Sequence, residues 1–213
     1  EAVAAIKDVY GADKTVAIML EGGTAVNYGT PAAYNFTAVI YSNDNTAINV
    51  DTSALAGNTT FDKVAVNAAN NTLYFNGNDV TFTENATTTV ASFYAGSNAV
   101  EGAYDAQTIV FDAKIATANI YLSSNNANTV YDGIVTLVVN NIESNPTIYF
   151  NASEDNTTTY NANVNINLKD ASAAKFADAK GETVLGDAAY VQLINSLGKE
   201  LDSVMNYPLK DAI

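Results

Sequence analysis

The chain has 213 residues and a formal net charge of −14, and only 15% of its residues are charged, against about 25% in an ordinary domain. It contains no Cys, His or Trp, which excludes disulfides, thiolate or imidazole metal sites, and Cys-His or Ser-His-Asp nucleophiles. The acidic balance also argues against nucleic acid and anionic membranes as partners, because both require a basic patch.

The first segment is residues 1–12, whose apolar side chains fit a short helix and an extended arm equally well. Gly11 separates this segment from the apolar run Thr15–Leu20, which is predicted to be a fully buried strand. The chain begins with Glu, which we interpret as the product of signal-peptide removal. We therefore expect an N-terminal arm, residues 1–12, followed by one head domain, residues 13–213.

From residue 33 onward, strands are predicted at intervals of roughly 8–15 residues, separated by turns rich in Asn, Asp and Gly. No repeat of fixed length is evident. Asn76–Gly77, between two of these strands, is the strongest hairpin signal in the chain. The predicted strands are Tyr34–Tyr41, Ala47–Val50, Lys63–Asn67, Thr72–Phe75, Val80–Thr83, Thr89–Ala95, Thr108–Lys114, Ala118–Leu122, Thr129–Val139, Thr147–Phe150 and Thr158–Leu168.

The clearest strand signal is the alternation in Tyr160–Leu168, where Asn residues at odd positions alternate with apolar residues at even positions. The even positions should pack on a core, and the odd ones should present amides to solvent, a sugar or a neighbouring chain. An exterior of Asn, Thr and Tyr stays hydrated where carboxylates are protonated. We therefore expect a protein that works outside a cell, at its surface, and we add acidic surroundings as a hypothesis.

The pattern changes after Leu168. Asp170 is placed to cap a short helix, Ala171–Lys180, that Gly181 would end. Asp187 is placed to cap a second helix, with apolar side chains at helical spacing at Val191, Ile194, Leu197, Leu201 and Val204. The predicted fold is thus all-β, an Ig-like or jelly-roll-type antiparallel β-sandwich with an extended N-terminal arm and short C-terminal helices.

N-glycosylation is the modification that the sequence predicts. Four of its Asn-x-Ser/Thr sequons fall at predicted strand ends or in turns, where a glycan can project, whereas Asn35 and Asn70 lie near predicted strands and would have to face outward. Asn145 is excluded because Pro146 follows it. The six candidate sites are Asn35, Asn58, Asn70, Asn85, Asn151 and Asn156.

Metal and cofactor sites are not expected. The turns Asn43–Asn45, Asn76–Asp79 and Glu154–Asn156 could offer oxygen ligands to Ca²⁺, but none has the spacing of an EF-hand loop, and solvated turns are the favoured interpretation. An internal crosslink without Cys is conceivable at Lys63, Lys114 or Lys169, since a neutral buried Lys can attack an Asn or Asp carbonyl. A plain surface Lys is favoured for each.

In overall character the chain resembles the archaeal thread subunits, the type I-like pili of thermoacidophiles. The resemblance rests on the start at Glu1, the tail Glu1–Ala12, the strand runs TVAIML, AVIYSNDNTAINV and YNANVNINL, the scattered sequons and the lack of Cys. It implies a glycosylated pilus built by donor-strand exchange, with isopeptide links between subunits. The tail residues that would fill a neighbour's groove are Val3, Ala5, Ile6 and Val9.

The function expected from these features is a structural subunit of an extracellular filament that assembles head to tail from copies of itself and serves adhesion or biofilm formation. Two other functions remain open. One is a monomeric surface-layer or adhesin domain that binds carbohydrate through Tyr and Asn. The other is a glycosidase with a pair of carboxylates, for which Glu143, Glu154 and Asp155 are the candidates.

Overall fold

The structure is a computed structural model of the chain. It describes residues 14–21, 24–28, 33–50, 54–169, 175–176, 180–187, 189 and 191–195. The described residues are almost entirely β, as expected, but every strand pairing is parallel, so the predicted antiparallel sandwich is wrong. The only helical element in this part of the chain is a 3₁₀ turn, η1 (Ala69–Asn71).

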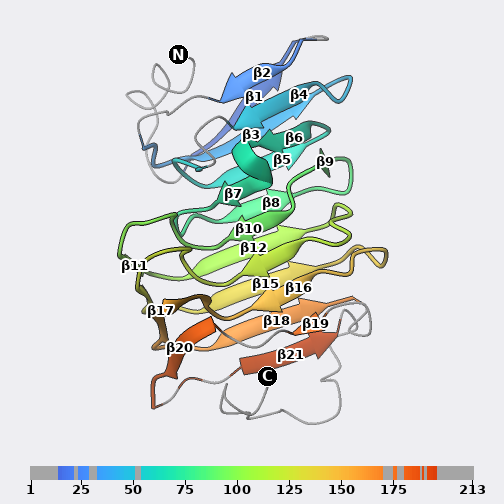
Figure 1. Cartoon of the computed structure of the whole chain (residues 1–213). Coiled ribbons are helices and arrows are strands. Elements are labelled where there is room, and N and C mark those ends of the chain that lie inside the picture. The colour runs from blue at the N-terminus through green and yellow to red at the C-terminus, as the bar shows by residue number, and fades with distance from the viewer. Residues whose placement is uncertain are drawn as a thin grey trace.

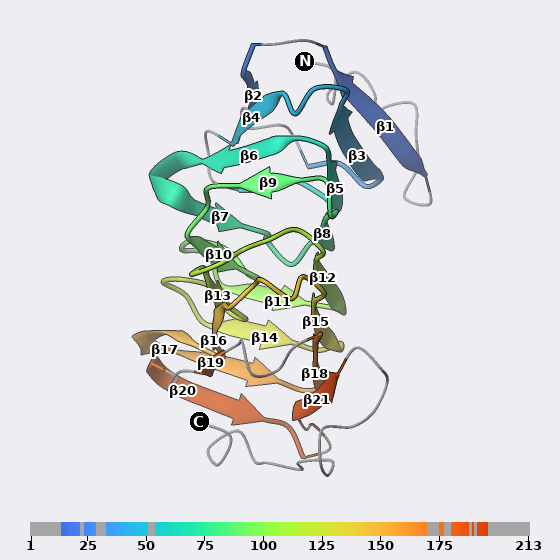
Figure 2. The same ribbon diagram turned by 90° about the vertical axis from the view of Figure 1, so that its right-hand side faces the viewer.

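The strands form four parallel sheets. Sheet A has the order β1-β3-β5-β8-β12-β15-β18-β21, sheet B β2-β4-β6-β9, sheet C β7-β10-β13-β16-β19 and sheet D β11-β14-β17-β20. The chain visits a strand of sheet A, then strands of the other sheets, and returns to sheet A beside its previous strand. Coils therefore stack from the N-terminal to the C-terminal end, and the fold is a parallel β-solenoid (Figures 1 and 2).

The strand bounds follow by sheet. Sheet A contains β1 (Thr15–Leu20), β3 (Thr37–Ser42), β5 (Thr59–Asp62), β8 (Val80–Phe82), β12 (Gln107–Phe111), β15 (Val135–Val139), β18 (Val164–Leu168) and β21 (Val191–Asn195). Sheet B contains β2 (Val26–Tyr28), β4 (Ala47–Val50), β6 (Ala65–Ala68) and β9 (Thr87–Thr88). Sheet C contains β7 (Thr72–Tyr74), β10 (Ser92–Tyr94), β13 (Asn119–Tyr121), β16 (Thr147–Tyr149) and β19 (Lys175–Phe176), and sheet D contains β11 (Gly102–Tyr104), β14 (Thr129–Tyr131), β17 (Ala152–Tyr160) and β20 (Lys180–Leu185).

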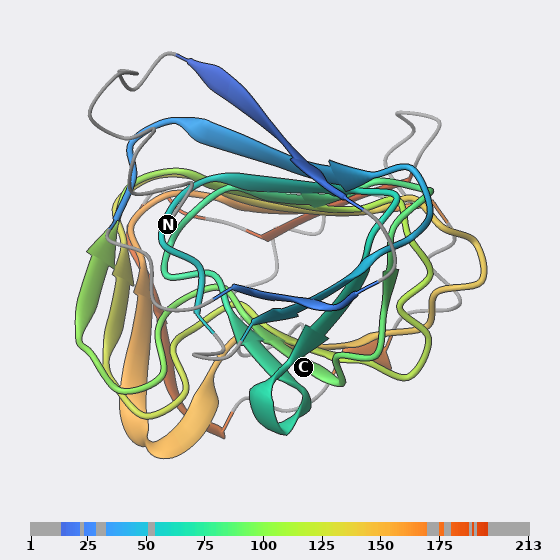
Figure 3. The same cartoon turned by 90° about the horizontal axis from the view of Figure 1, so that it is seen from above.

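Coil length changes along the solenoid. In sheet A, the paired residues Thr15 and Thr37 are 22 positions apart, whereas Val80 and Ile109 are 29 apart. The later coils also take in sheet D, which starts at β11. Viewed along the stack, the coils nonetheless superimpose around one interior (Figure 3). Each coil supplies the dozen or more residues that a parallel crossover requires.

The core lies inside the coils and is built from alternating strand positions. In β15 the inward residues Val135, Leu137 and Val139 are buried, whereas the residues between them are partly exposed. Equivalent residues stack from coil to coil. The clearest example is a column of phenylalanines, in which Phe82 lies 5.0 Å from Phe61 and 5.2 Å from Phe111 between ring centroids. All three side chains are fully buried.

Polar and aromatic columns also run along the outside. On sheet C, the rings of Tyr74, Tyr94, Tyr121 and Tyr149 stack face to face, with successive centroids 4.9, 4.4 and 4.5 Å apart. On sheet B, the amide of Asn49 donates to Asn27 at 3.3 Å and accepts from Asn67 at 3.1 Å. The exterior is thus ordered by the same coil-to-coil register as the core.

A turn does form at Asn76–Gly77, as predicted, but the strands on either side of it do not pair with each other. Asn76 has φ 54° and Gly77 φ 75°, the left-handed values that favour Asn and Gly. The strands on either side, β7 and β8, belong to different sheets. The turn is therefore a corner of one coil, and no antiparallel hairpin forms there.

The predicted C-terminal helices are also wrong wherever the chain is described. Residues 175–176 and 180–185 form strands β19 and β20, and residues 191–195 form β21, which pairs with β18. Leu197, Leu201 and Val204 lie outside the described residues. Because the neighbouring coil offers an open strand edge, pairing outweighs the weak helical spacing of these segments.

The predictions for the strands Tyr160–Leu168 and Thr15–Leu20 had different outcomes. The alternation in Tyr160–Leu168 is confirmed for β18, where Val164, Ile166 and Leu168 are buried and the Asn residues between them are partly exposed. The expectation that Thr15–Leu20 is fully buried is wrong. In β1 only Leu20 is buried, because this strand is the outermost one of sheet A among the described residues.

Because several tyrosines are buried, the free energy of unfolding should depend on pH in the alkaline range. Desolvation is the largest cause that raises the pKa of seven tyrosines above the ordinary value of 10.0, namely Tyr28, Tyr34, Tyr74, Tyr94, Tyr121, Tyr131 and Tyr160. Above pH 10 the unfolded chain ionises first and binds fewer protons than the folded one, so the free energy of unfolding should fall as pH rises. Denaturant unfolding at increasing pH, followed by phenolate absorbance, checks this. An unfolding free energy that stays constant up to about pH 11 would contradict it.

Candidate ligand groove

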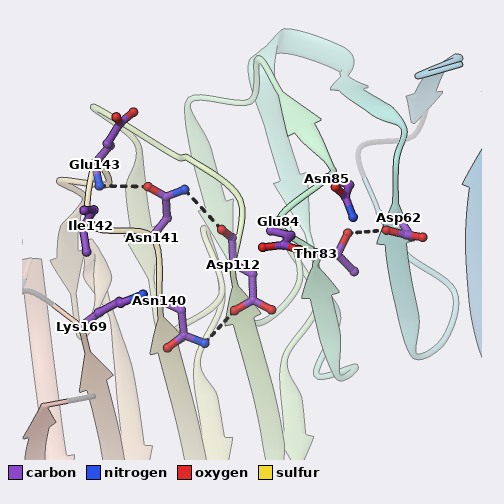
Figure 4. Close-up of a pocket in the computed structure, with 10 residues that line it drawn as sticks. All are labelled: Asp62, Thr83, Glu84, Asn85, Asp112, Asn140, Asn141, Ile142, Glu143 and Lys169. Carbon is purple, nitrogen blue, oxygen red and sulfur yellow. Dashed lines mark hydrogen bonds between the residues drawn. The ribbon is translucent and has the colours of Figure 1, made fainter. Parts of the chain in front are cut away.

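An open groove of about 780 Å³ runs along the outside of the solenoid, at the ends of the sheet A strands (Figure 4). It crosses five neighbouring strands, β5, β8, β12, β15 and β18. At the usual strand spacing these five strands span about 19 Å along the stack. The lining residues are Asp62, Thr83, Glu84, Asn85, Asp112, Asn140, Asn141, Ile142, Glu143 and Lys169.

The floor of the groove is one polar row in coil-to-coil register. Asp62, Thr83, Asp112, Asn140 and Lys169 each lie at or directly after the end of a sheet A strand. The Thr83 hydroxyl donates to Asp62 Oδ1 at 2.7 Å, and Asn140 Nδ2 donates to Asp112 Oδ1 at 2.6 Å. These bonds between neighbouring coils hold both carboxylates in fixed orientations and leave their remaining acceptor positions for a ligand.

Two short turns form the sides of the groove. After β8, Ala86 N donates to Thr83 O at 3.0 Å, and this turn carries the exposed side chains of Glu84 and Asn85. After β15, Asn141 Oδ1 accepts from Glu143 N at 2.9 Å, which closes a turn around Ile142. The Ile142 side chain is 61% exposed, an apolar contact surface among polar neighbours.

The groove is negative overall. Four carboxylates line it, those of Asp62, Glu84, Asp112 and Glu143, together with one ammonium, that of Lys169. Glu143 Oε2 lies 3.0 Å from Lys114 Nζ, but both side chains are more than half exposed, so this pair contributes little stability. In the part of the chain that the structure describes, no group of three or more acidic side chains is arranged to hold a metal ion.

No protein-family model, curated protein or solved structure matches this chain. Among the described residues, no helix is long and apolar enough to cross a membrane.

The sequons occupy different environments. Asn35, Asn70 and Asn85 have exposed side chains, and those of Asn58 and Asn156 are partly exposed. Asn151 is 1% exposed, and its Nδ2, the atom to which a glycan would attach, donates to Asn156 O at 2.8 Å. A glycan on Asn151 would have no room in this buried position. Asn85 is the one sequon that lines the groove.

The other sequence-predicted sites are scattered. Lys63, Lys114 and Lys169 are all exposed, so none has the apolar surroundings that an isopeptide-forming Lys requires. Of the three carboxylates considered for a glycosidase, Glu143 lines the groove, whereas Glu154 and Asp155 lie in β17 on sheet D. The donor-strand residues Val3, Ala5, Ile6 and Val9 lie outside the described residues.

Two of the three segments considered for Ca²⁺, Asn43–Asn45 and Asn76–Asp79, have side chains engaged in internal hydrogen bonds, and the third, Glu154–Asn156, is part of strand β17. Asp44 Oδ1 accepts from the Thr46 hydroxyl at 2.5 Å, and this bond is the main cause that lowers the Asp44 pKa. Asn76 Nδ2 donates to Leu55 O at 2.9 Å, and Asp79 Oδ1 accepts from Thr108 N at 2.6 Å. The Asn76 and Asp79 side chains thus join neighbouring coils, whereas the Asp44 bond is local to its own turn.

Sequence reasoning missed the groove because its residues come from five coils. Asp62, Asp112 and Lys169 each lie at or after the end of a strand, and no local motif indicates that they belong to one row. The available signal was the spacing of similar segments, since TIVFD, TLVVN and NINLK occupy equivalent positions of successive coils. A comparison of the chain with itself at the coil length would have aligned them.

Proposed function

We propose that this protein is a cell-surface β-solenoid that binds a linear carbohydrate along the groove beside sheet A. The observation that carries the proposal is the groove itself, with its fixed carboxylates, its amides and the exposed Ile142 side chain. The exterior supports a surface location, because only 15% of the residues are charged and uncharged amides form the Asn27–Asn49–Asn67 ladder of sheet B.

The groove chemistry suits a polyol. Carboxylates accept hydrogen bonds from hydroxyl groups, amides both donate and accept, and the Lys169 ammonium donates. Ile142 offers an apolar surface against which the C–H face of a sugar ring can pack. A ligand that lies along the stack meets one residue of the floor row in each coil, which favours an extended polymer over a compact molecule.

An extended peptide fits less well. Peptides that add to a sheet pair with an unpaired strand edge. The strands under the groove, β5 to β18, each have a neighbour on both sides, so no such edge is present there. Nucleic acid is disfavoured by the four carboxylates.

Binding is also favoured over hydrolysis. A glycosidase needs a pair of carboxyl groups that flank the scissile bond, one of them kept protonated by burial so that it can act as the general acid. Here Glu84 and Glu143 are exposed and the groove is open along one side of the solenoid. We therefore propose a binding protein and no enzymatic activity.

The tyrosines are not proposed as sugar platforms. A sugar stacks on an exposed ring face, and in the sheet C column the faces of Tyr94 and Tyr121 are turned toward neighbouring rings. The donor-strand pilus also loses its basis, because it required a sandwich with one strand missing. Within the described residues, the fold is a parallel solenoid instead.

Single substitutions in the groove should weaken carbohydrate binding without unfolding the chain. Glu84→Ala removes a charged hydrogen-bond partner, and Ile142→Ala removes the apolar contact; both side chains are exposed. A charged hydrogen bond contributes about 1.5–3 kcal/mol, so Glu84→Ala should raise Kd about tenfold or more. Calorimetric titration with cello- and chito-oligosaccharides measures this.

Matched controls lie away from the groove. Glu154→Ala and Val100→Ala remove equally exposed acidic and apolar side chains on other parts of the coils. Both should leave Kd unchanged. Equal losses in the control and groove variants, or no binding of either oligosaccharide, would contradict the proposal.

A further inference from the structure

The groove contains a sequon whose acceptor side chain lies at the binding surface. Asn85-Ala86-Thr87 matches Asn-x-Thr, and Asn85 belongs to the turn that forms one side of the groove (Figure 4). Its side chain is exposed, and Thr87 at position three of the sequon is exposed as well. Both residues that a glycosyl-transfer enzyme must reach are therefore at the surface.

A glycan on Asn85 would start inside the groove. The backbone around Asn85 is held by the Ala86 N to Thr83 O bond and by the bond from Thr87 N to Val64 O at 2.9 Å, so the turn cannot swing the sugar away easily. The first sugars would lie beside Asp62 and Thr83, groups suited to hydroxyl contacts. The same positions are those that an external oligosaccharide would use.

We propose that N-glycosylation of Asn85 closes the groove, because the attached glycan occupies the site of the external carbohydrate; the inference rests on the proposed function. The transfer forms a bond between Asn85 Nδ2 and the anomeric carbon of a sugar. It breaks that sugar's bond to a polyprenyl diphosphate carrier, which leaves as the diphosphate, and the amide loses one proton. The unmodified protein thus binds external carbohydrate, whereas in the glycosylated protein its own glycan fills the groove.

Asn70 provides a matched control for the modification. It is exposed and lies in a sequon, but it belongs to η1 between sheets B and C and does not line the groove. A glycan on Asn70 adds about the same mass and volume to the surface as a glycan on Asn85. Only the Asn85 glycan should affect the groove.

The experiment compares the full chain made without glycosylation with the same chain secreted from a host that glycosylates sequons. Peptide mass mapping reports occupancy, calorimetry with cello- and chito-oligosaccharides reports binding, and backbone NMR reports the groove residues Asn140–Glu143. The secreted protein should carry a glycan at Asn85, bind at least about tenfold more weakly, and show shifted Asn140–Glu143 signals. Thr87→Ala, which removes the sequon without changing a groove-lining residue, should restore binding in the secreted form, whereas Asn70→Gln and Thr87→Ser should not.

The outcomes separate the two proposals. If unmodified protein binds but the Asn85 glycan changes neither Kd nor the groove signals, or if Asn85 stays unmodified where Asn70 is modified, the inference is wrong and the proposed function stands. If unmodified protein binds none of the oligosaccharides but the Asn85 glycan shifts the groove signals, the groove holds only the attached glycan, and the proposed function is wrong.

Discussion

Phe82→Ala should lower the free energy of unfolding by about 4 kcal/mol, the largest effect expected of a single side chain here. Phe82 is fully buried between Phe61 and Phe111, and a third ring, that of Phe93, lies 5.7 Å away edge-on. In a solenoid each coil packs only on its neighbours, so no other segment can move in to fill the cavity. The loss should combine the transfer free energy of the ring with the cost of the void.

Denaturant unfolding of the two proteins measures this difference. Phe176→Ala serves as the control, since Phe176 is only partly buried and its ring lies 6.3 Å from its partner Phe150. The control should lose clearly less stability than Phe82→Ala. Losses of equal size, or a loss below about 1 kcal/mol for Phe82→Ala, would show that the aromatic column does not hold the coils together.

Gly133→Ala should cost about 3 kcal/mol, because it places a methyl group against the backbone of the preceding coil. A Cβ at Gly133 would lie 2.3 Å from Ala106 N and 2.7 Å from Ala106 Cα. Backbone cannot rotate out of the way as a side chain can, so the two coils must separate locally. The stack depends on this close approach at the corner between sheets D and A.

Gly186 occupies the neighbouring turn position two coils further along and gives a matched control. Its built Cβ would lie 3.2 Å from the nearest atom, Asn161 Cα, so Gly186→Ala requires only a small shift. Thermal unfolding should show a much larger decrease in Tm for Gly133→Ala than for Gly186→Ala. Similar decreases for the two variants would contradict tight coil stacking at Gly133.

The sequence was sufficient to predict most strands but not how they pair. Ala47–Val50 forms β4 with the bounds predicted, and the predicted strand Thr129–Val139 is divided by a turn into β14 and β15. Alternation of inward and outward side chains is the same in parallel and antiparallel sheets, so it could not distinguish a sandwich from a solenoid.

The signal for stacked coils was present only in part of the chain. Tyr104, Tyr131 and Tyr160 recur at 27 and 29 residues, and their ring centroids lie 5.5 and 5.4 Å apart. The N-terminal coils are shorter, with Ala38 paired to Thr59 at 21 residues. Because the coil length changes where sheet D begins, no single period describes the chain. The expectation of no fixed repeat was therefore compatible with a solenoid of stacked coils.

The candidate site was predicted only in fragments. Glu143 was considered for catalysis, Lys169 for a crosslink and Asn85 for glycosylation, each as a separate residue. Parallel stacking brings all three to one groove together with Asp62 and Asp112. Register between coils is a tertiary property, so a reading of local patterns could not assemble the site.

The most direct test of the account is a backbone NMR titration of the unmodified full chain with cello- and chito-oligosaccharides. If the groove binds carbohydrate, the shifted signals should cluster at Asp62, Thr83–Asn85, Asp112, Asn140–Glu143 and Lys169, which only the parallel stack places side by side. Shifts confined to the tyrosine column of sheet C, or spread over the coils without a focus, would contradict the proposed groove.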